Sequence, residues 1–107
     1  MHRALGPGLV ESVYEACLCH ELSQRGVAFE RQVALPIMYR EMRLESGLRI
    51  DLLVQEYVIV ELKAVEKLIP LFDAQLLTYL KLSGKRLGLL MNFNVLLLKD
   101  GIKRLVR

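Results

Sequence analysis

The stretch Arg49-Ile-Asp-Leu-Leu-Val-Gln-Glu-Tyr-Val-Ile-Val-Glu-Leu-Lys63 decides the fold. Its β-branched and leucine-rich residues alternate with a period of two, which predicts two strands separated by a loop near Gln55 and Glu56. Three charged residues interrupt these otherwise apolar strands: Asp51, Glu61 and Lys63. Burying such charges is costly unless they are paired or hold a metal ion, so they are the first indication of function.

The length of the loop decides whether the two acids face each other. A two-residue loop would place Asp51 and Glu61 on opposite faces of the sheet. A three-residue loop or a bulge would place them directly opposite each other, with their Cβ atoms about 5 Å apart. We predict the odd-length loop or the bulge, in which the two carboxylates repel unless a cation lies between them. The alternative interpretation is a buried Glu61–Lys63 pair with Asp51 at the surface.

Composition restricts the class of protein. The chain has 107 residues, of which 53% are hydrophobic and 25% charged, with a net charge of +3. These values are typical of one globular domain, which we place at residues 1–107. Residues 1–62 carry six Lys/Arg and nine Asp/Glu, whereas residues 63–107 carry nine and three. The basic C-terminal half suits a polyanionic partner, although a charge run is commonly just a solvated face.

The cysteines and the hydropathy bear on location. Cys17 and Cys19 would point to different sides of a helix, so a disulfide between them is implausible. We expect Cys17 in the core and Cys19 at the surface of a protein in the reducing cytoplasm. The N-terminus shows no signal pattern and no run is long enough to span a bilayer, so no membrane association is expected.

A helix is predicted before the central stretch. It runs from about Leu9 to Gln24, follows the break at Gly6-Pro7-Gly8, and is closed by Gly26 as a left-handed cap. Its apolar stripe consists of Val10, Val13, Tyr14, Cys17 and Leu18. Glu11 lies at the edge of this stripe, where it is either a first-turn acid favoured by the helix dipole or a functional residue. Glu21 lies nearer the middle and is expected to be buried with a hydrogen-bonding partner.

Strands are predicted on both sides of the central stretch. Residues 27–39 alternate loosely as one long strand with Pro36 at an edge or bulge, followed by a turn at residues 40–43 and a short return strand from Leu44. The apolar run at residues 87–92 is a buried strand. The Asp100-Gly101 pair predicts a C-terminal β-hairpin between residues 95–99 and 102–106.

A second helix is predicted between the central stretch and the apolar run at 87–92. It begins at Pro70, runs from about Leu71 to Leu82 and ends at Ser83-Gly84. Gln75 and Tyr79 are four residues apart and therefore share one face of this helix. The helix connects two strands as a β-α-β crossover, which makes them a parallel pair. The fold class is therefore α/β, with a mixed central sheet and helices packed against it.

Several motifs follow one another in the order of a known family. Asp51 is followed after nine residues by Glu61-x-Lys63, and the next helix carries Gln75-x-x-x-Tyr79. This arrangement resembles the PD-(D/E)XK nuclease superfamily, whose restriction-endonuclease-like core has the order αβββαβ, and in particular its RecB-like branch. The segment Gly8-Leu-Val-Glu11-Ser-Val-Tyr14-Glu15 resembles the namesake motif of the GxxExxY protein family, a bacterial group in that superfamily. The similarity continues through residues 49–54, 60–63, 74–79 and 92–94.

The resemblance implies a role for each matching residue. It implies that Asp51, Glu61 and the backbone carbonyl of Leu62 hold Mg²⁺ or Mn²⁺, with Glu11 reaching the same ion directly or through water. Lys63 would position the attacking water or offset the charge of the transition state. Contacts to the substrate would come from three further residues: Gln75, Tyr79 and Tyr14.

These roles predict a metal-dependent nuclease that hydrolyses phosphodiester bonds of DNA or RNA. The alternative is a non-catalytic nucleic-acid-binding or assembly module that retains the nuclease fold. The expected partner is nucleic acid, with DNA favoured over RNA. The short chain also favours a homodimer or a subunit of a larger complex, because one small domain has a small footprint on nucleic acid.

Overall fold

The computed structural model describes residues 2–107. Its elements along the chain are α1 (His2–Leu5), α2 (Glu11–Gln24), β1 (Phe29–Ala34), β2 (Ile37–Tyr39), β3 (Met42–Leu44), β4 (Arg49–Val54), β5 (Val58–Lys63), α3 (Pro70–Ser83), β6 (Leu87–Asn92), the 3-10 turn η1 (Leu98–Gly101) and β7 (Ile102–Val106). Among these residues no helix is long and apolar enough to cross a bilayer.

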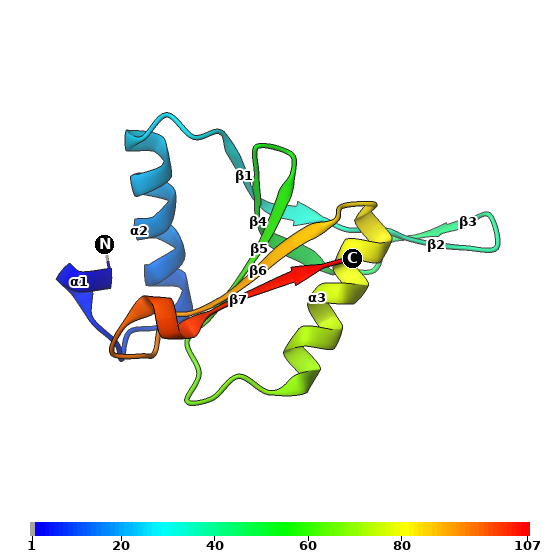
Figure 1. Ribbon diagram of the computed structural model, residues 1–107. Coiled ribbons are helices and arrows are strands. Elements are labelled where there is room, and N and C mark those ends of the chain that lie inside the picture. The colour runs from blue at the N-terminus through cyan, green and yellow to red at the C-terminus, as the bar shows by residue number, and fades with distance from the viewer. Residues whose placement is uncertain (1) are drawn as a thin grey trace.

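A five-stranded mixed sheet with the order β1-β4-β5-β6-β7 forms the centre of the molecule. β5 and β6 are parallel and connected through α3, whereas the neighbouring pairs are antiparallel. One buried cluster contains Leu76 and Leu80 of α3, and a second contains Tyr14 and Cys19 of α2. The two helices therefore cover opposite faces of the sheet (Figure 1). This arrangement confirms the α/β fold with its β-α-β crossover.

The loop between β4 and β5 has three residues. The register pairs Leu52 with Val60 and Val54 with Val58, which leaves residues 55–57 as the loop. Gln55 and Glu56 have φ angles of 53° and 56°, so the chain turns through two left-handed residues. The same register, continued by one position, sets Asp51 opposite Glu61. The predicted odd-length loop is confirmed.

In β1 and β4 the alternation of side chains between the two faces of the sheet is interrupted at the level of Asp51. Phe29 packs in the α2 cluster and Val33 in the α3 cluster, although an unbroken strand would place both on one face. β4 shows the same change, because Ile50 packs in the α3 cluster and Leu52 in the α2 cluster. The register pairs Arg31 with Leu52 and Val33 with Ile50, so it is unchanged on both sides of the Gln32–Asp51 position. The two strands thus kink together.

The buried face of α2 differs from the predicted one. The helix begins at Glu11, not Leu9, and its buried residues are Tyr14, Glu15 and Cys19. Cys19 is buried and Cys17 only half-buried, so the prediction for the two cysteines is wrong. The apolar residues alone predict an inner face that includes Cys17. The observed inner face includes Cys19 instead, because it also contains an acid, Glu15, which the apolar pattern does not count as buried.

Glu21 is not the buried acid of α2. Its side chain is 42% exposed and forms an ion pair with Arg25, one turn later, at 3.9 Å. The prediction that it is buried is therefore wrong, because the inner face of the helix is rotated away from it. Gly26, with a φ of 69°, ends the helix region as predicted.

The predicted long strand is divided at Leu35 and Pro36. β1 belongs to the central sheet, whereas β2 pairs with β3 in a separate two-stranded sheet. Proline lacks the N–H that a continuing ladder needs, so the strand cannot pass through Pro36 in the central sheet. The β2–β3 hairpin turns at residues 40 and 41 and projects from the body of the molecule (Figure 1).

The hairpin predicted around Asp100-Gly101 does not form. Residues 95–99 contain no strand, and β7 instead pairs antiparallel with β6 after the 3-10 turn. Gly101 is buried, and a Cβ atom there would lie 2.1 Å from the Asn92 carbonyl oxygen. The glycine is thus required by the close approach of two backbone segments rather than by a hairpin turn.

Candidate active site

Asp51 and Glu61 lie where the β4–β5 ladder stops. The backbone pairing between these strands extends as far as Leu52 and Val60. One position further, the Asp51 N–H donates to Glu61 Oε1 at 3.2 Å, and the Leu62 N–H donates to Asp51 Oδ2 at 2.8 Å. Each acid thus accepts a hydrogen bond from the facing strand, and the two carboxylates lie close together between the strands.

The pKa of Glu61 reflects this position. The residue is 7% exposed. Burial, followed by the negative charge of Asp51, raises the pKa of Glu61 from its ordinary value of 4.5 to about 8, while Lys63 acts in the opposite direction. At pH 7 and without a cation, Glu61 is therefore mostly protonated. A cation beside the two acids would favour the ionised form of both.

Glu11 is the first residue of α2 and lies within electrostatic reach of Asp51. Partial burial and then the charge of Asp51 raise its pKa above the ordinary value of 4.5, and Lys63 lowers it. A helix N-terminus alone would lower the pKa of a carboxyl group. The increase in the pKa of Glu11 therefore comes first from partial burial and second from the Asp51 charge.

Lys63 lies on β5, two residues after Glu61. Its Nζ atom is 4.6 Å from the centroid of the Phe72 ring on α3. Among residues 2–107, the ion pairs do not include one between Lys63 and Glu61. The alternative of a buried Glu61–Lys63 pair with a surface aspartate is therefore wrong, since Asp51 is itself half-buried between the strands.

The α3 helix contributes Gln75 and Tyr79. Burial raises the pKa of the Tyr79 phenol, and the charges of Glu61 and Asp51 add to this increase. The hydroxyl is thus within electrostatic reach of both acids. Gln75 lies one turn earlier on the same face and is exposed, which leaves its amide accessible.

Tyr14 does not line the site. It is fully buried and stacks on Phe93, with ring centroids 4.7 Å apart. Its hydroxyl donates to the Gly6 carbonyl at 2.6 Å and accepts from the Leu9 N–H at 3.1 Å. The predicted substrate contact is contradicted by this burial. Tyr14 instead holds the glycine-rich segment that precedes α2.

Tyr14→Phe is expected to destabilise the protein without a direct effect on the site. The substitution keeps the stacked ring and removes both hydrogen bonds, which should lower the free energy of unfolding by roughly 1–3 kcal/mol. Chemical denaturation of the variant and the wild type measures this difference. Unchanged stability would contradict the structural role, and weaker substrate binding at unchanged stability would restore the original prediction.

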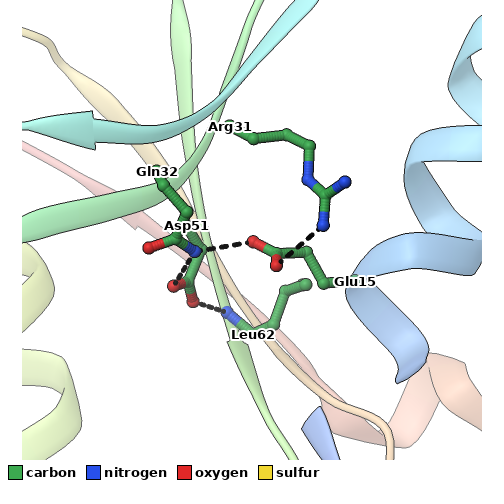
Figure 2. Close-up of polar contacts among 5 residues, drawn as sticks. All are labelled: Glu15, Arg31, Gln32, Asp51 and Leu62. Carbon is green, nitrogen blue, oxygen red and sulfur yellow. Dashed lines mark hydrogen bonds and ion pairs between the residues drawn. The ribbon is translucent and has the colours of Figure 1, made fainter. Parts of the chain in front are cut away.

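A polar network beside Asp51 was not predicted from the sequence (Figure 2). Glu15 of α2 accepts hydrogen bonds from Arg31 Nη2 at 3.2 Å and from Gln32 Nε2 at 2.8 Å. The same Gln32 nitrogen lies 3.4 Å from Asp51 Oδ1. The only sequence signal for this network is the position of Glu15 beside the Glu11 and Tyr14 motif.

The donor set suits a hard divalent ion. Within residues 2–107, no group of three or more His, Cys, Asp or Glu side chains lies close enough together to hold a metal ion. Asp51 and Glu61 still offer two adjacent carboxylates. Mg²⁺ commonly binds through only one or two carboxylates and keeps several water ligands. The residues present therefore fit such an ion.

Comparison with known proteins agrees with this geometry. A protein-family model described as the PD-(D/E)XK nuclease superfamily matches residues 1–105. No curated protein and no solved structure matches the chain. The matched range includes all of the site residues, from Glu11 to Tyr79.

Proposed function

Because the chain belongs to the PD-(D/E)XK nuclease superfamily, we propose that it is a metal-dependent nuclease that hydrolyses phosphodiester bonds of DNA or RNA. The observation that carries this proposal is the pair of acids, Asp51 and Glu61, which lie close together between β4 and β5. Nucleases of this superfamily generally use divalent metal ions. We also propose that, within this superfamily, the chain belongs to the GxxExxY group.

Asp51 and Glu61 would hold Mg²⁺ or Mn²⁺, together with the carbonyl oxygen of Leu62. A bound divalent ion polarises the phosphate and lowers the pKa of its bound water. The Leu62 N–H already donates to Asp51, so this backbone segment is fixed beside the carboxylate. Glu11 would reach the same ion, directly or through water, from the start of α2.

Lys63 would act at the reacting phosphate. It follows Glu61 by two residues on β5, so both side chains project from the same face of the strand. Its ammonium group would position the attacking water or offset the negative charge that develops in the transition state. The Phe72 ring, 4.6 Å from Nζ, holds the charge in a defined place on this face.

Gln75 and Tyr79 would contact the phosphate backbone of the substrate. Gln75 and Tyr79 share one face of α3. This face lies near Asp51 and Glu61, whose charges contribute to the raised pKa of the Tyr79 hydroxyl. The basic C-terminal half of the chain, with nine Lys/Arg against three Asp/Glu, would add long-range attraction for a polyanion. Assembly as a homodimer, or within a larger complex, would extend the footprint.

A cleavage assay with a matched lysine pair tests the proposal. Labelled single- and double-stranded DNA and RNA are incubated with the protein and Mg²⁺ or Mn²⁺, with EDTA as the blank. Lys63→Ala should slow cleavage by about 100-fold or more, since it removes a charge beside the reacting group. Lys67→Ala, at an exposed position between β5 and α3, should change the rate less than about twofold.

Two results would overturn catalysis at this site. Cleavage that is equally fast in Lys63→Ala and wild type would point to a contaminating nuclease. Binding of nucleic acid without cleavage, with an affinity that falls steeply as salt rises, would identify a non-catalytic binding module instead.

A further inference from the structure

Gln32 has an unusual backbone conformation for a residue within a strand. Its φ angle is 50°, in the left-handed region that residues with a side chain rarely adopt. Such a conformation persists only where the surrounding structure holds it in place. Gln32 is also the β1 residue at the level of Asp51, where both strands change faces. The kink in the two strands therefore lies at the position of Asp51.

The kink lets two successive side chains reach one acid. Arg31 and Gln32 are neighbours in β1 and would point to opposite faces of an unbroken strand. Here both donate to Glu15, through Arg31 Nη2 at 3.2 Å and Gln32 Nε2 at 2.8 Å. The Glu15 side chain is 12% exposed, whereas the Arg31 side chain is 48% exposed and Gln32 is also exposed, so the acceptor is largely shielded from water and its two donors approach it from the surface.

The Gln32 amide also faces Asp51 (Figure 2). Its nitrogen lies 3.4 Å from Asp51 Oδ1, while Asp51 Oδ2 accepts from the Leu62 N–H at 2.8 Å. Each oxygen of the Asp51 carboxylate thus has a different donor, one from β1 and one from β5. These two donors fix the rotation of the carboxylate about its own axis.

We propose that Gln32 is a positioning residue: its amide orients the Asp51 carboxylate for the metal ion, and the Glu15–Arg31 pair fixes the amide. This inference rests on the metal site of the proposed function. Groups that hydrogen-bond a metal-binding carboxylate orient it and commonly change metal affinity by 10- to 100-fold when removed. A network that only joined α2 to the sheet would affect stability and leave metal affinity unchanged.

Two glutamines provide a matched test. Gln55, in the β4–β5 loop, also has a left-handed φ angle, 53°, and it is exposed. Gln32→Gly and Gln55→Gly both relieve a left-handed backbone, but only the first removes an amide beside Asp51. Mn²⁺ binding is measured by calorimetry on both variants, with thermal unfolding recorded in parallel.

Gln32→Gly should weaken Mn²⁺ binding by about tenfold or more, whereas Gln55→Gly should leave it within about twofold of wild type. Gln32→Met, which keeps the length of the side chain and lacks its donors, should weaken binding to the same extent and serves if the glycine variant does not fold. Wild-type Mn²⁺ affinity in both Gln32 variants would overturn the positioning role, whatever happens to the unfolding temperature.

Asp51→Ala separates this inference from the proposed function. If Asp51→Ala abolishes Mn²⁺ binding and the Gln32 variants bind normally, the metal site stands and the positioning role is wrong. If the wild type binds no Mn²⁺, or Asp51→Ala binds it equally well, the proposed metal site is wrong and the role of Gln32 falls with it.

Discussion

Asp51→Asn should abolish Mn²⁺ binding and slow nucleic-acid cleavage by about 1000-fold or more, while the protein still folds. The substitution removes one of the two negative charges that would hold the ion. The asparagine oxygen can still accept the hydrogen bond that the Leu62 N–H makes at 2.8 Å. A loss of function in this variant would therefore result from the missing negative charge and not from a disrupted strand.

The same variant should also lower the pKa of Glu61. The charge of Asp51 contributes to the raised value, although burial contributes more and remains in the variant. Calorimetry with Mn²⁺, a cleavage assay and circular dichroism together check the prediction. Asp100→Asn, at an exposed acid in η1, is the matched control and should behave as wild type. Cleavage by Asp51→Asn at the wild-type rate would remove Asp51 from the site.

Glu61→Gln should remove a pH dependence of stability from the metal-free protein. Folding raises the pKa of Glu61 from 4.5 to about 8, so between these pH values the folded state binds a proton that the unfolded state has lost. The stability of the wild type should therefore fall as pH rises from about 4.5 to about 8, and level off above that. The contribution is on the order of 5 kcal/mol.

Chemical denaturation at pH 5, 7 and 9 in the presence of EDTA measures this effect. Because other groups also titrate, the quantity to compare is the difference between wild type and Glu61→Gln at each pH. The variant should gain stability relative to wild type as pH rises, and it should bind no Mn²⁺. A difference that is constant from pH 5 to 9 would show that the pKa of Glu61 is not raised in the folded protein.

A divalent ion should offset this fall in stability in the wild type. Binding requires the ionised form of Glu61, so below pH 8 it should release about one proton from this group and weaken about tenfold for each unit by which pH falls. The metal-bound protein should therefore lose less stability at high pH than the metal-free protein does.

Much of the site could be predicted because its signals are local. The odd-length loop is predicted from Asp51 and Glu61, two charged residues in apolar strands that lie opposite each other only across such a loop or a bulge. Pro70 and Gly84 mark the ends of α3, which fixes the face that carries Tyr79. Each of these inferences uses residues within one hairpin or one helix, where periodicity and capping decide the structure.

The rest depends on contacts between distant segments. Gln32 reaches Asp51 only because β1 and β4 kink together, and no residue type at either position signals a kink. Asp100-Gly101 has the composition of a hairpin turn, but Gly101 is selected by its approach to the Asn92 carbonyl. The inner face of α2 was misassigned because Glu15 is a buried acid whose partners, Arg31 and Gln32, lie in another element.

The separate β2–β3 hairpin makes the molecule suitable for modification by protein engineering. Its strands pair with each other and not with the central sheet, and its exposed turn at Arg40 and Glu41 lies at the far end of a projection from the body. Exposed turns that carry no part of a core accept inserted sequence with little loss of stability. A fluorophore or an affinity tag can thus be attached at this turn, where it leaves Asp51 and Glu61 in their native surroundings.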